Sequence, residues 1–366
     1  MLGLWSKRLI ASNDKAGKGY LIFVDNSGFK VAATESYVLY TRDFRSYKVN
    51  KLGSNASYFS ATVLNGQTLV WMRIYKDNYT NSYMSQSKYE DVIYKVNEDL
   101  SFGTVLSGRI AEENTIVANL NNHASGFASN GKLCIGSERY RAGGNACRST
   151  DFVNWSLLSG HSSDQVSNPL YKDGVFYVVS GTGNSNCVVM RSHDGSSWSK
   201  SNVLSYRGAG FTRYLVACDS FFIIIAGDYT ENDRTTRCSV SSNGVQWVDR
   251  KLPVSMAAYP LVGKDFVLLY EASTSTFVKV TGLDSFSTVS PTFDGESYNS
   301  IVGTNGSYIF RSIDGGERII ALPYAGGKVY ASSDGVAFTS IGETPLSSKP
   351  SRDIILSGFY KGILGL

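Results

Sequence analysis

The chain has 366 residues, of which 13% are aromatic and 18% charged, and its formal net charge at pH 7 is +4. This composition excludes a disordered chain, and the scattered basic residues lack the concentrated stripe that a nucleic-acid surface needs. No apolar run is long enough to span a membrane, because the longest, residues 221–227, has only the length of a strand.

The N-terminal residues and the cysteines indicate where the chain is made. No basic region followed by an apolar run opens the sequence, so we expect no secretory signal. The five cysteines are odd in number and form no Cys-x-x-Cys pair. This pattern favours free thiols and synthesis in a reducing compartment.

Short apolar strands separated by turn residues follow one another along the chain, and we expect no helix of useful length. Apolar runs joined by Asn-Gly or Asp-Gly predict tight hairpins at Asn65-Gly66, Asn130-Gly131, Asp173-Gly174 and Asn305-Gly306. The first and last units hold surplus predicted strands, at 8–11 and 29–33 and at 300–302. A further strand, predicted over 353–360, would close the structure by pairing with N-terminal residues.

One polar turn recurs between these strands, and its clearest copy is Ser192-His193-Asp194-Gly195-Ser196-Ser197-Trp198. The Ser192 hydroxyl and the Asp194 carboxylate can accept backbone N–H groups within the turn, while Gly195 supplies a positive φ. The aromatic residue then starts the next strand and packs against a neighbouring sheet. In five clear copies we assign this structural role to Asp43, Tyr47, Asp151, Trp155, Ser192, Asp194, Trp198, Asn243, Trp247, Asp334 and Phe338.

Two weaker copies, with the aromatic residues Phe102 and Phe286, bring the number of units to seven. Successive aromatic residues lie between 39 residues apart (Trp247 to Phe286) and 55 residues apart (Tyr47 to Phe102). This spacing is typical of one four-stranded sheet per unit, arranged in a closed ring. The surplus strands leave six or eight units as alternatives.

The turns resemble the Asp-box, or bacterial neuraminidase repeat, of sialidase-like β-propellers. Their shortened form, Ser-x-Asp-Gly-x-x-Trp, is similar to repeats in bacteriophage virion proteins. The resemblance covers nearly the whole chain, but only through the repeat. It implies an all-β fold, a β-propeller of seven four-stranded blades in one domain over residues 1–366. It also implies that the turns lie between the third and fourth strands, on the face opposite the ligand site.

On that opposite face the connections between second and third strands emerge together with the connections between blades. Two of these segments are rich in Tyr, Asn and Arg, which suits binding to sugars or protein partners. The candidate ligand- or partner-binding residues are Arg73, Tyr75, Tyr79, Tyr83, Tyr89, Arg139, Tyr140 and Arg141. The alternative is a solvated loop whose tyrosines pack locally.

Catalytic and metal sites find little support in the sequence. Resemblance to sialidases in the active site would require an arginine triad, a Tyr–Glu pair and an Asp acid. The only similar stretch, Phe310-Arg311-Ser312-Ile313, lacks the Pro of the family's element and lies near the opposite end of the chain from it. The acidic segment 228–233 lacks the central Gly and terminal Glu of a calcium loop. We therefore name no catalytic residue, no metal ligand and no cofactor.

These observations favour a non-enzymatic β-propeller that serves as a binding or assembly module. The resemblance implies a bacteriophage virion protein, made in the host cytoplasm, that is tail-associated, an adaptor or receptor-binding. Its partners would be other virion proteins or a host-surface glycan or receptor, without nucleic acid, and a homo-oligomer is left open. The alternatives are a bacterial lectin or sialidase-like glycoside hydrolase in the bacterial cytoplasm, and a structural ring whose sides contact neighbouring subunits.

Overall fold

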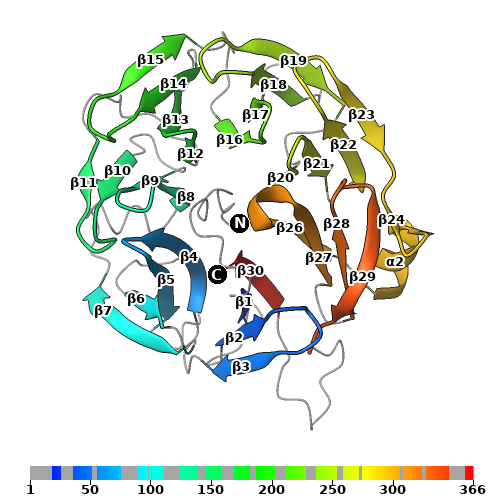
Figure 1. The fold of residues 1–366 in the computed structure, drawn as a ribbon, viewed down its shortest axis with the longest axis horizontal. Coiled ribbons are helices and arrows are strands. Elements are labelled where there is room, and N and C mark those ends of the chain that lie inside the picture. Colours follow the sequence, from blue (N-terminus) through cyan, green and yellow to red (C-terminus); the bar gives the residue numbers. More distant parts are fainter. Residues whose placement is uncertain are drawn as a thin grey trace, which may run out of the picture.

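Seven sheets, each built on four antiparallel strands, stand around a common centre in the computed structural model (Figure 1). The predicted fold class, an all-β propeller of seven four-stranded blades, is confirmed. The structure describes residues 19–25, 36–51, 56–75, 89–97, 99, 101–110, 124–138, 146–158, 169–181, 187–202, 211–227, 236–253, 259–271, 274–305, 308–323, 327–345 and 359–365.

In blades two to seven the strands follow the chain from the innermost to the outermost. Blade two is β4 (Ala56–Leu64), β5 (Gln67–Tyr75), β6 (Tyr89–Val96) and β7 (Phe102–Ile110). Blade three is β8 (Ala124–Ser129), β9 (Cys134–Glu138), β10 (Ala146–Ser149) and β11 (Ser156–Leu157). Blade four is β12 (Leu170–Lys172), β13 (Val175–Gly181), β14 (Cys187–Ser192) and β15 (Ser199–Asn202).

The remaining blades repeat this plan. Blade five is β16 (Phe211–Ala217), β17 (Phe222–Gly227), β18 (Thr236–Ser241) and β19 (Val248–Leu252). Blade six is β20 (Tyr259–Val262), β21 (Val267–Glu271), β22 (Thr276–Val280) and β23 (Phe286–Val289). Blade seven is β26 (Tyr308–Ile313), β27 (Arg318–Pro323), β28 (Lys328–Ser332) and β29 (Ala337–Glu343).

Blade one closes the ring, because it combines the two ends of the chain. The C-terminal strand β30 (Phe359–Gly365) is innermost and pairs antiparallel with β1 (Tyr20–Asp25), which is followed outward by β2 (Ser36–Thr41) and β3 (Lys48–Lys51). The predicted closure is confirmed, but the pairing strand begins at Phe359, later than the predicted range 353–360. The surplus strands predicted at 8–11 and 29–33 lie outside the described residues.

Blade seven carries an addition that corrects two expectations. Residues 300–302, predicted as a strand, belong to the helix α2 (Tyr298–Asn305), so Asn305 ends a helix and is not part of a hairpin. The Ser297 hydroxyl accepts the N–H of Ser300 at 3.2 Å, and Ile301 is buried, which together favour the helix.

Before α2, a small hairpin of β24 (Thr292–Phe293) and β25 (Glu296–Ser297) turns at Asp294-Gly295, where both residues have positive φ. The predicted hairpins at Asn65-Gly66, Asn130-Gly131 and Asp173-Gly174 are present. Among the described residues, α2 and the single 3₁₀ turn η2 (Asp314–Gly316) are the only helices, and neither is long enough to cross a membrane.

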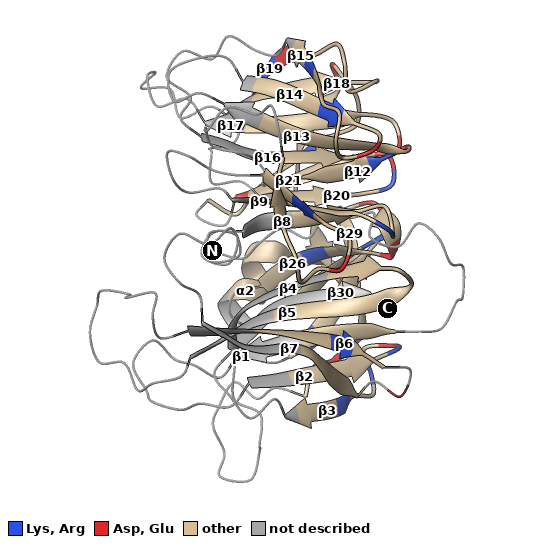
Figure 2. Cartoon of the chain, turned by 90° about the vertical axis from the view of Figure 1, so that its left-hand side faces the viewer, with Lys and Arg blue, Asp and Glu red and all other residues tan. Residues whose placement is uncertain are grey.

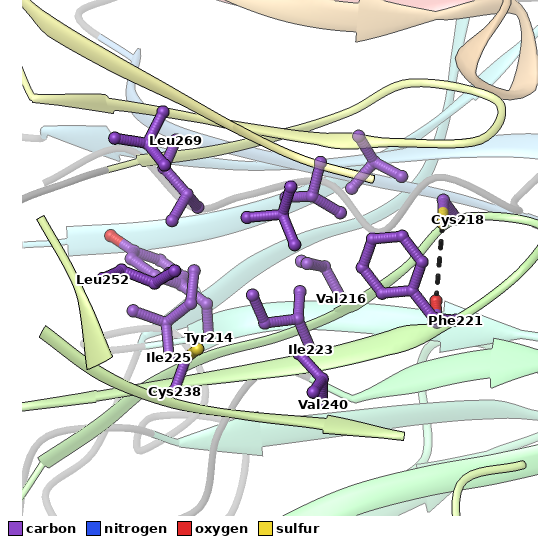
Figure 3. Packing of buried hydrophobic residues seen from close by; sticks show 14 residues of the cluster. Tyr214, Val216, Cys218, Phe221, Ile223, Ile225, Cys238, Val240, Leu252 and Leu269 are labelled. Atoms are coloured by element: carbon purple, nitrogen blue, oxygen red, sulfur yellow. Dashed lines mark hydrogen bonds between the residues drawn. The ribbon is translucent and has the colours of Figure 1, made fainter. Parts of the chain in front are cut away.

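The hydrophobic core lies in the seams between blades. In the seam between blades five and six, Ile223 and Ile225 of β17 belong to one buried cluster with Leu269 of β21 (Figure 3). Each blade contributes one apolar face to each neighbour, so no blade can bury its core alone.

The described cysteines belong to this core. Cys134, Cys147, Cys218 and Cys238 are buried free thiols, as the sequence predicted. Burial raises the pKa of Cys134 to about 12, although a hydrogen bond to Thr62 acts in the opposite direction. These cysteines therefore pack as small apolar side chains.

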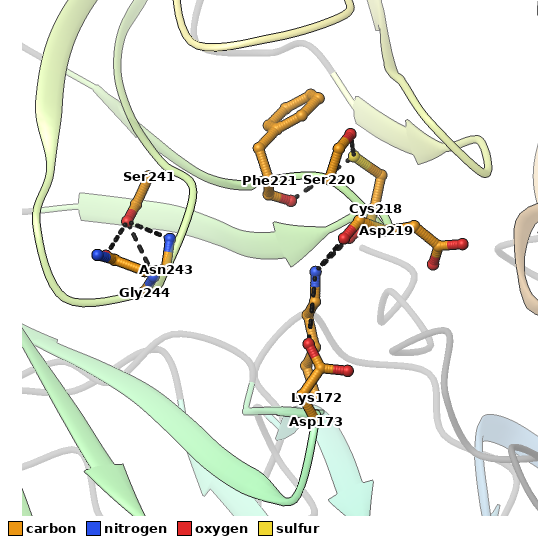
Figure 4. Close-up of polar contacts among 9 residues, drawn as sticks. All are labelled: Lys172, Asp173, Cys218, Asp219, Ser220, Phe221, Ser241, Asn243 and Gly244. Carbon is orange, nitrogen blue, oxygen red and sulfur yellow. Dashed lines mark hydrogen bonds and ion pairs between the residues drawn. The ribbon is translucent and has the colours of Figure 1, made fainter.

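Basic side chains join several seams at the hairpin turns. Lys172 of blade four is buried and donates to the carbonyl oxygens of Cys218 at 2.6 Å and Asp219 at 2.9 Å in blade five (Figure 4). Arg250 of blade five likewise donates to the carbonyl of Leu283 in blade six at 2.9 Å. These charge-assisted bonds link the turns of adjacent blades.

The seam between blades seven and one holds a closed polar cluster. The Tyr20 hydroxyl donates to Asp314 Oδ1 at 2.7 Å and accepts from Arg318 Nη2 at 2.5 Å, while Arg318 Nε donates to Asp314 Oδ2 at 2.7 Å. Burial and the hydrogen bond to Asp314 raise the pKa of Tyr20. The phenol therefore stays protonated and links the first strand of the chain to blade seven.

Candidate functional site

The topology separates the connections into two faces. Connections between the second and third strands and between blades leave from one face, which we call the loop face. The first-to-second and third-to-fourth strand hairpins lie on the other, which we call the turn face. Figure 2 shows charged residues in these hairpin turns along one side of the ring.

The strand ends that border the predicted binding segments lie on the loop face. Strand β5 ends at Tyr75 and β6 begins at Tyr89, and these two residues are register partners. In the neighbouring blade three, β9 ends at Glu138 and β10 begins at Ala146. The segments 76–88 and 139–145 therefore leave from the same face of adjacent blades.

The candidate residues themselves divide into two groups. Arg73, Tyr75 and Tyr89 have a described backbone, with Arg73 opposite Asp91 in the ladder. Their side chains lie outside the described residues, and so do the residues Tyr79, Tyr83, Arg139, Tyr140 and Arg141. Their role in binding stays a prediction.

The turn face is built from the repeated polar turn, with the hydrogen bonds that its sequence predicts. In blade four, Ser192 Oγ accepts the N–H of Gly195 at 2.8 Å and donates to Asp194 Oδ1 at 2.9 Å. The same carboxylate oxygen accepts the N–H groups of Ser196 and Ser197, both at 2.8 Å. The turn thus satisfies its own backbone and leaves little capacity for chemistry.

The four other clear copies have the same geometry. Their hydroxyl and carboxylate or amide partners are Thr41 and Asp43, Ser149 and Asp151, Ser241 and Asn243 (Figure 4), and Ser332 and Asp334. In each copy the carboxylate or amide oxygen accepts backbone N–H groups of its own turn. Blades two and six have shorter turns, and in blade two Asp99 accepts from the N–H and the hydroxyl of Ser101.

The aromatic residue of each clear copy packs against a buried cluster between blades, but the depth of its burial differs from copy to copy. Tyr47, Trp155, Trp198 and Trp247 are only partly buried, Phe286 is 41% exposed, and only Phe338 is fully buried. The most buried position is the one directly after the acidic residue. Phe44 and Phe152 occupy it at 1% exposure with φ of 61° and 66°.

The other three clear copies have glycine at that position, and the preceding blade fills the space. A Cβ on Gly195 would lie 2.3 Å from Leu133 Cδ2 of blade three, and one on Gly244 would lie 2.7 Å from Tyr177 Cε1 of blade four. The seam is therefore filled either by the turn itself, with phenylalanine, or by the neighbour, opposite glycine. The sequence signal for this difference is phenylalanine in place of glycine at the position directly after the acidic residue of the turn.

The carboxylate of the turn predicts that the stability of the protein depends on pH, and two reciprocal substitutions can test this. The N–H groups of Ser197 and Ser196 and the Ser192 hydroxyl hold the pKa of Asp194 at about 2. Because this folded pKa lies below the ordinary 3.8, the stabilisation is full above about pH 4 and is lost as the pH falls toward 2. Thermal melts between pH 7 and pH 2 should show a shallower acid loss in Asp194→Asn.

Asn243 supplies the reciprocal variant, because its Oδ1 already accepts the N–H groups of Val245 at 2.9 Å and Gln246 at 3.0 Å. Asn243→Asp should keep this geometry and steepen the acid loss. Equal acid limbs in wild type and both variants would contradict this account of the turn.

A shallow depression of about 360 Å³ is present on the turn face between blades six and seven. Its lining combines two basic residues with three acidic ones, Lys264, Lys279, Asp265, Glu317 and Asp334. The Lys279 ammonium lies 4.5 Å from the centre of the Phe266 ring. Because both signs of charge line it, the depression offers no concentrated charge of one sign to a ligand. Within the described residues, no three His, Cys, Asp or Glu side chains are grouped to hold a metal ion.

Comparison with known proteins shows the fold alone. No family model matches the sequence, and no curated protein sequence matches it. A Bacteroides uniformis protein, provisionally assigned as a 6-phosphogluconolactonase, is similar with a TM-score of 0.53 at 9% identity, covering 95% of this chain and 99% of that one.

Two further structures are less similar. Apo AztD from Citrobacter koseri has a TM-score of 0.49 at 9% identity, covering 94% of this chain and 97% of that one. The Hadza microbial sialidase Hz136 has a TM-score of 0.41 at 12% identity, covering 93% and 65%. The blades and the first of these similarities define the chain as a seven-bladed β-propeller.

Proposed function

We propose that the protein is a non-enzymatic binding module whose ligand or protein partner contacts the loop face over blades two and three. The observation that carries this proposal is that the segment 76–88, with Tyr79 and Tyr83, and the segment 139–145, which begins Arg-Tyr-Arg, leave from the loop face of these adjacent blades. The turn face supports it by contrast, because its acidic residues are engaged in their own turns.

The test compares tyrosine variants of the long segment with a variant on the opposite face. Tyr79→Ala and Tyr83→Ala should each weaken saturable binding to glycan arrays or to bacterial cell surfaces about 30-fold, the loss typical of a central aromatic contact. Lys132 is an exposed residue of a turn-face hairpin, so Lys132→Ala is the control and should bind as wild type does. Wild-type binding by both tyrosine variants would contradict the proposal.

A finer proposal concerns the biological setting. The shortened Asp-box-like turns and the tyrosine-rich strands resemble those of bacteriophage virion proteins, which supports a tail-associated, adaptor or receptor-binding role in the virion. Portal or tail genes beside the gene for this protein would support that setting. Neighbouring genes of bacterial sugar metabolism would contradict it and favour the lectin or the sialidase-like hydrolase.

The hydrolase is the second candidate function, because retaining glycosidases also occur on propellers with such turns. It predicts release of the fluorophore from a fluorogenic sialoside. Arg213 lies in β16, the innermost strand of blade five, and Arg213→Ala should abolish that activity. A protein that binds glycans without releasing the fluorophore is a lectin.

A further inference from the structure

The rim of the ring presents the outer strand of each blade, and such edges expose unpaired backbone N–H and C=O groups. Proteins commonly protect exposed edges with charged residues, short strands, bulges or a covering segment. The outer strands of this propeller differ in these protections, and the differences identify one edge.

Blade seven shows what a covered edge looks like in this chain. Strand β24 runs parallel to the outer strand β29, with the N–H of Thr292 donating to the carbonyl of Val336 and that of Asp294 to the carbonyl of Phe338, both at 2.9 Å. Phe293 of β24 is fully buried and stacks on Phe338, with ring centroids 4.6 Å apart and an interplanar angle of 11°. An added strand therefore completes the burial of the first aromatic residue of β29.

Most other edges are protected in different ways. Strand β11 has only two residues, and the pairing of β7 with β6 shifts register twice, which marks bulges. Charged residues occupy β3, β15 and β19: Lys48, Lys51, Lys200, Asp249, Arg250 and Lys251. Each of these features discourages the addition of another strand.

Within the described residues, strand β23 of blade six has no charge, no bulge and no covering strand. Its residues, Phe286, Ser287, Thr288 and Val289, carry no charge and pair with β22 without a register shift. Phe286 is the first aromatic residue of β23, as Phe338 is of β29. Phe286 is 41% exposed, however, whereas Phe338 is 1% exposed. The edge of β23 thus resembles that of blade seven with its added strand removed.

We propose that the outer edge of β23 binds an extended segment of a partner protein, which pairs parallel to β23 and places an aromatic or large apolar side chain on Phe286. The β24–β29 pair supplies the parallel direction and the aromatic stack. This addition of a strand to an edge is a general mode of peptide recognition.

The parallel direction argues against a second copy of this chain. Two copies related by a two-fold axis would pair their β23 strands antiparallel. A four-residue edge would also bury far less than the roughly 1,000 Å² expected of a stable dimer. The rim site is separate from the loop face, so its test does not depend on the function proposed above.

The probe is a synthetic peptide with the sequence of residues 289–297, which contains β24 and its Phe293. At millimolar concentration it should slow hydrogen exchange of the β23 amides in the full-length protein in a saturable manner. Both a peptide with alanine at the Phe293 position and the protein variant Phe286→Lys should weaken this protection at least 10-fold.

Val248→Lys is the matched control, because Val248 lies on the outer strand β19 and is also 41% exposed. It should leave the protection of β23 unchanged, and unchanged melting of both lysine variants would show that they fold. The absence of protection, or protection that survives Phe286→Lys, would overturn the proposal. A Phe286-dependent dimer in light scattering would also overturn it, in favour of a second copy.

Discussion

Replacing Phe152 by alanine is expected to lower the free energy of unfolding by about 3–5 kcal/mol, the cost of removing a buried phenylalanine. The ring is 1% exposed and packs on Phe127 and Trp155, with centroids 5.0 Å and 5.5 Å away. Phe152→Gly is expected to cost about 1 kcal/mol less than Phe152→Ala. The reason is the φ of 66°, which strains any residue with a Cβ but not glycine.

Urea unfolding of wild type and both variants measures this order. Phe176 is the control, because it is equally buried but lies in β13 without a positive φ. There glycine should be worse than alanine by about 0.5–1 kcal/mol. If glycine were also the worse substitution at Phe152, the left-handed turn would not be the source of strain.

The local chemistry of the turns could be predicted from sequence because it is complete within six residues. A hydroxyl, an acceptor two positions later and a residue at positive φ determine the hydrogen bonds of Asp194 without any neighbour. The seam contacts could not be predicted in this way. The space beside Gly195, where a side chain could otherwise lie, is occupied by Leu133, which is 62 positions earlier and in another blade.

The repeat spacing predicted the number of blades but not the addition to blade seven. Its hairpin had a local signal in Asp294-Gly295, and its helix had one in Ser297. The parallel pairing of β24 with β29 joins segments 45 residues apart in register, Thr292 with Ala337, and has no periodic signature. Local signals therefore identified the turns, while long-range pairing decided where this segment packs.

The face of the candidate site followed from strand order, since four antiparallel strands per blade send alternate connections to opposite faces. The end of the second strand and the start of the third, Tyr75 and Tyr89, therefore lie together at the loop face. The positions of individual side chains did not follow, because long loops have no repeating backbone pattern.

Gly342→Ala is expected to lower the free energy of unfolding by about 3 kcal/mol or more, because the added methyl group meets backbone. A Cβ at this residue of β29 would lie 1.9 Å from the carbonyl oxygen of Phe44 in blade one. Backbone of a hydrogen-bonded turn cannot move aside as a side chain can, so the seam between blades seven and one must widen. The bond from Arg45 Nε to the carbonyl of Ile341, 3.1 Å long, would then weaken.

Gly103→Ala is the matched control, since Gly103 also lies in an outer strand and its nearest neighbour, Asn97 Nδ2, would be an ordinary 3.5 Å from a new Cβ. Thermal melting should separate the two variants clearly. Hydrogen exchange should rise in β29 and in the β1–β30 pair of Gly342→Ala but not in blades three and four, because the change opens the ring where its two ends meet. Uniformly faster exchange in every blade would instead mean that the seams have no independent stability.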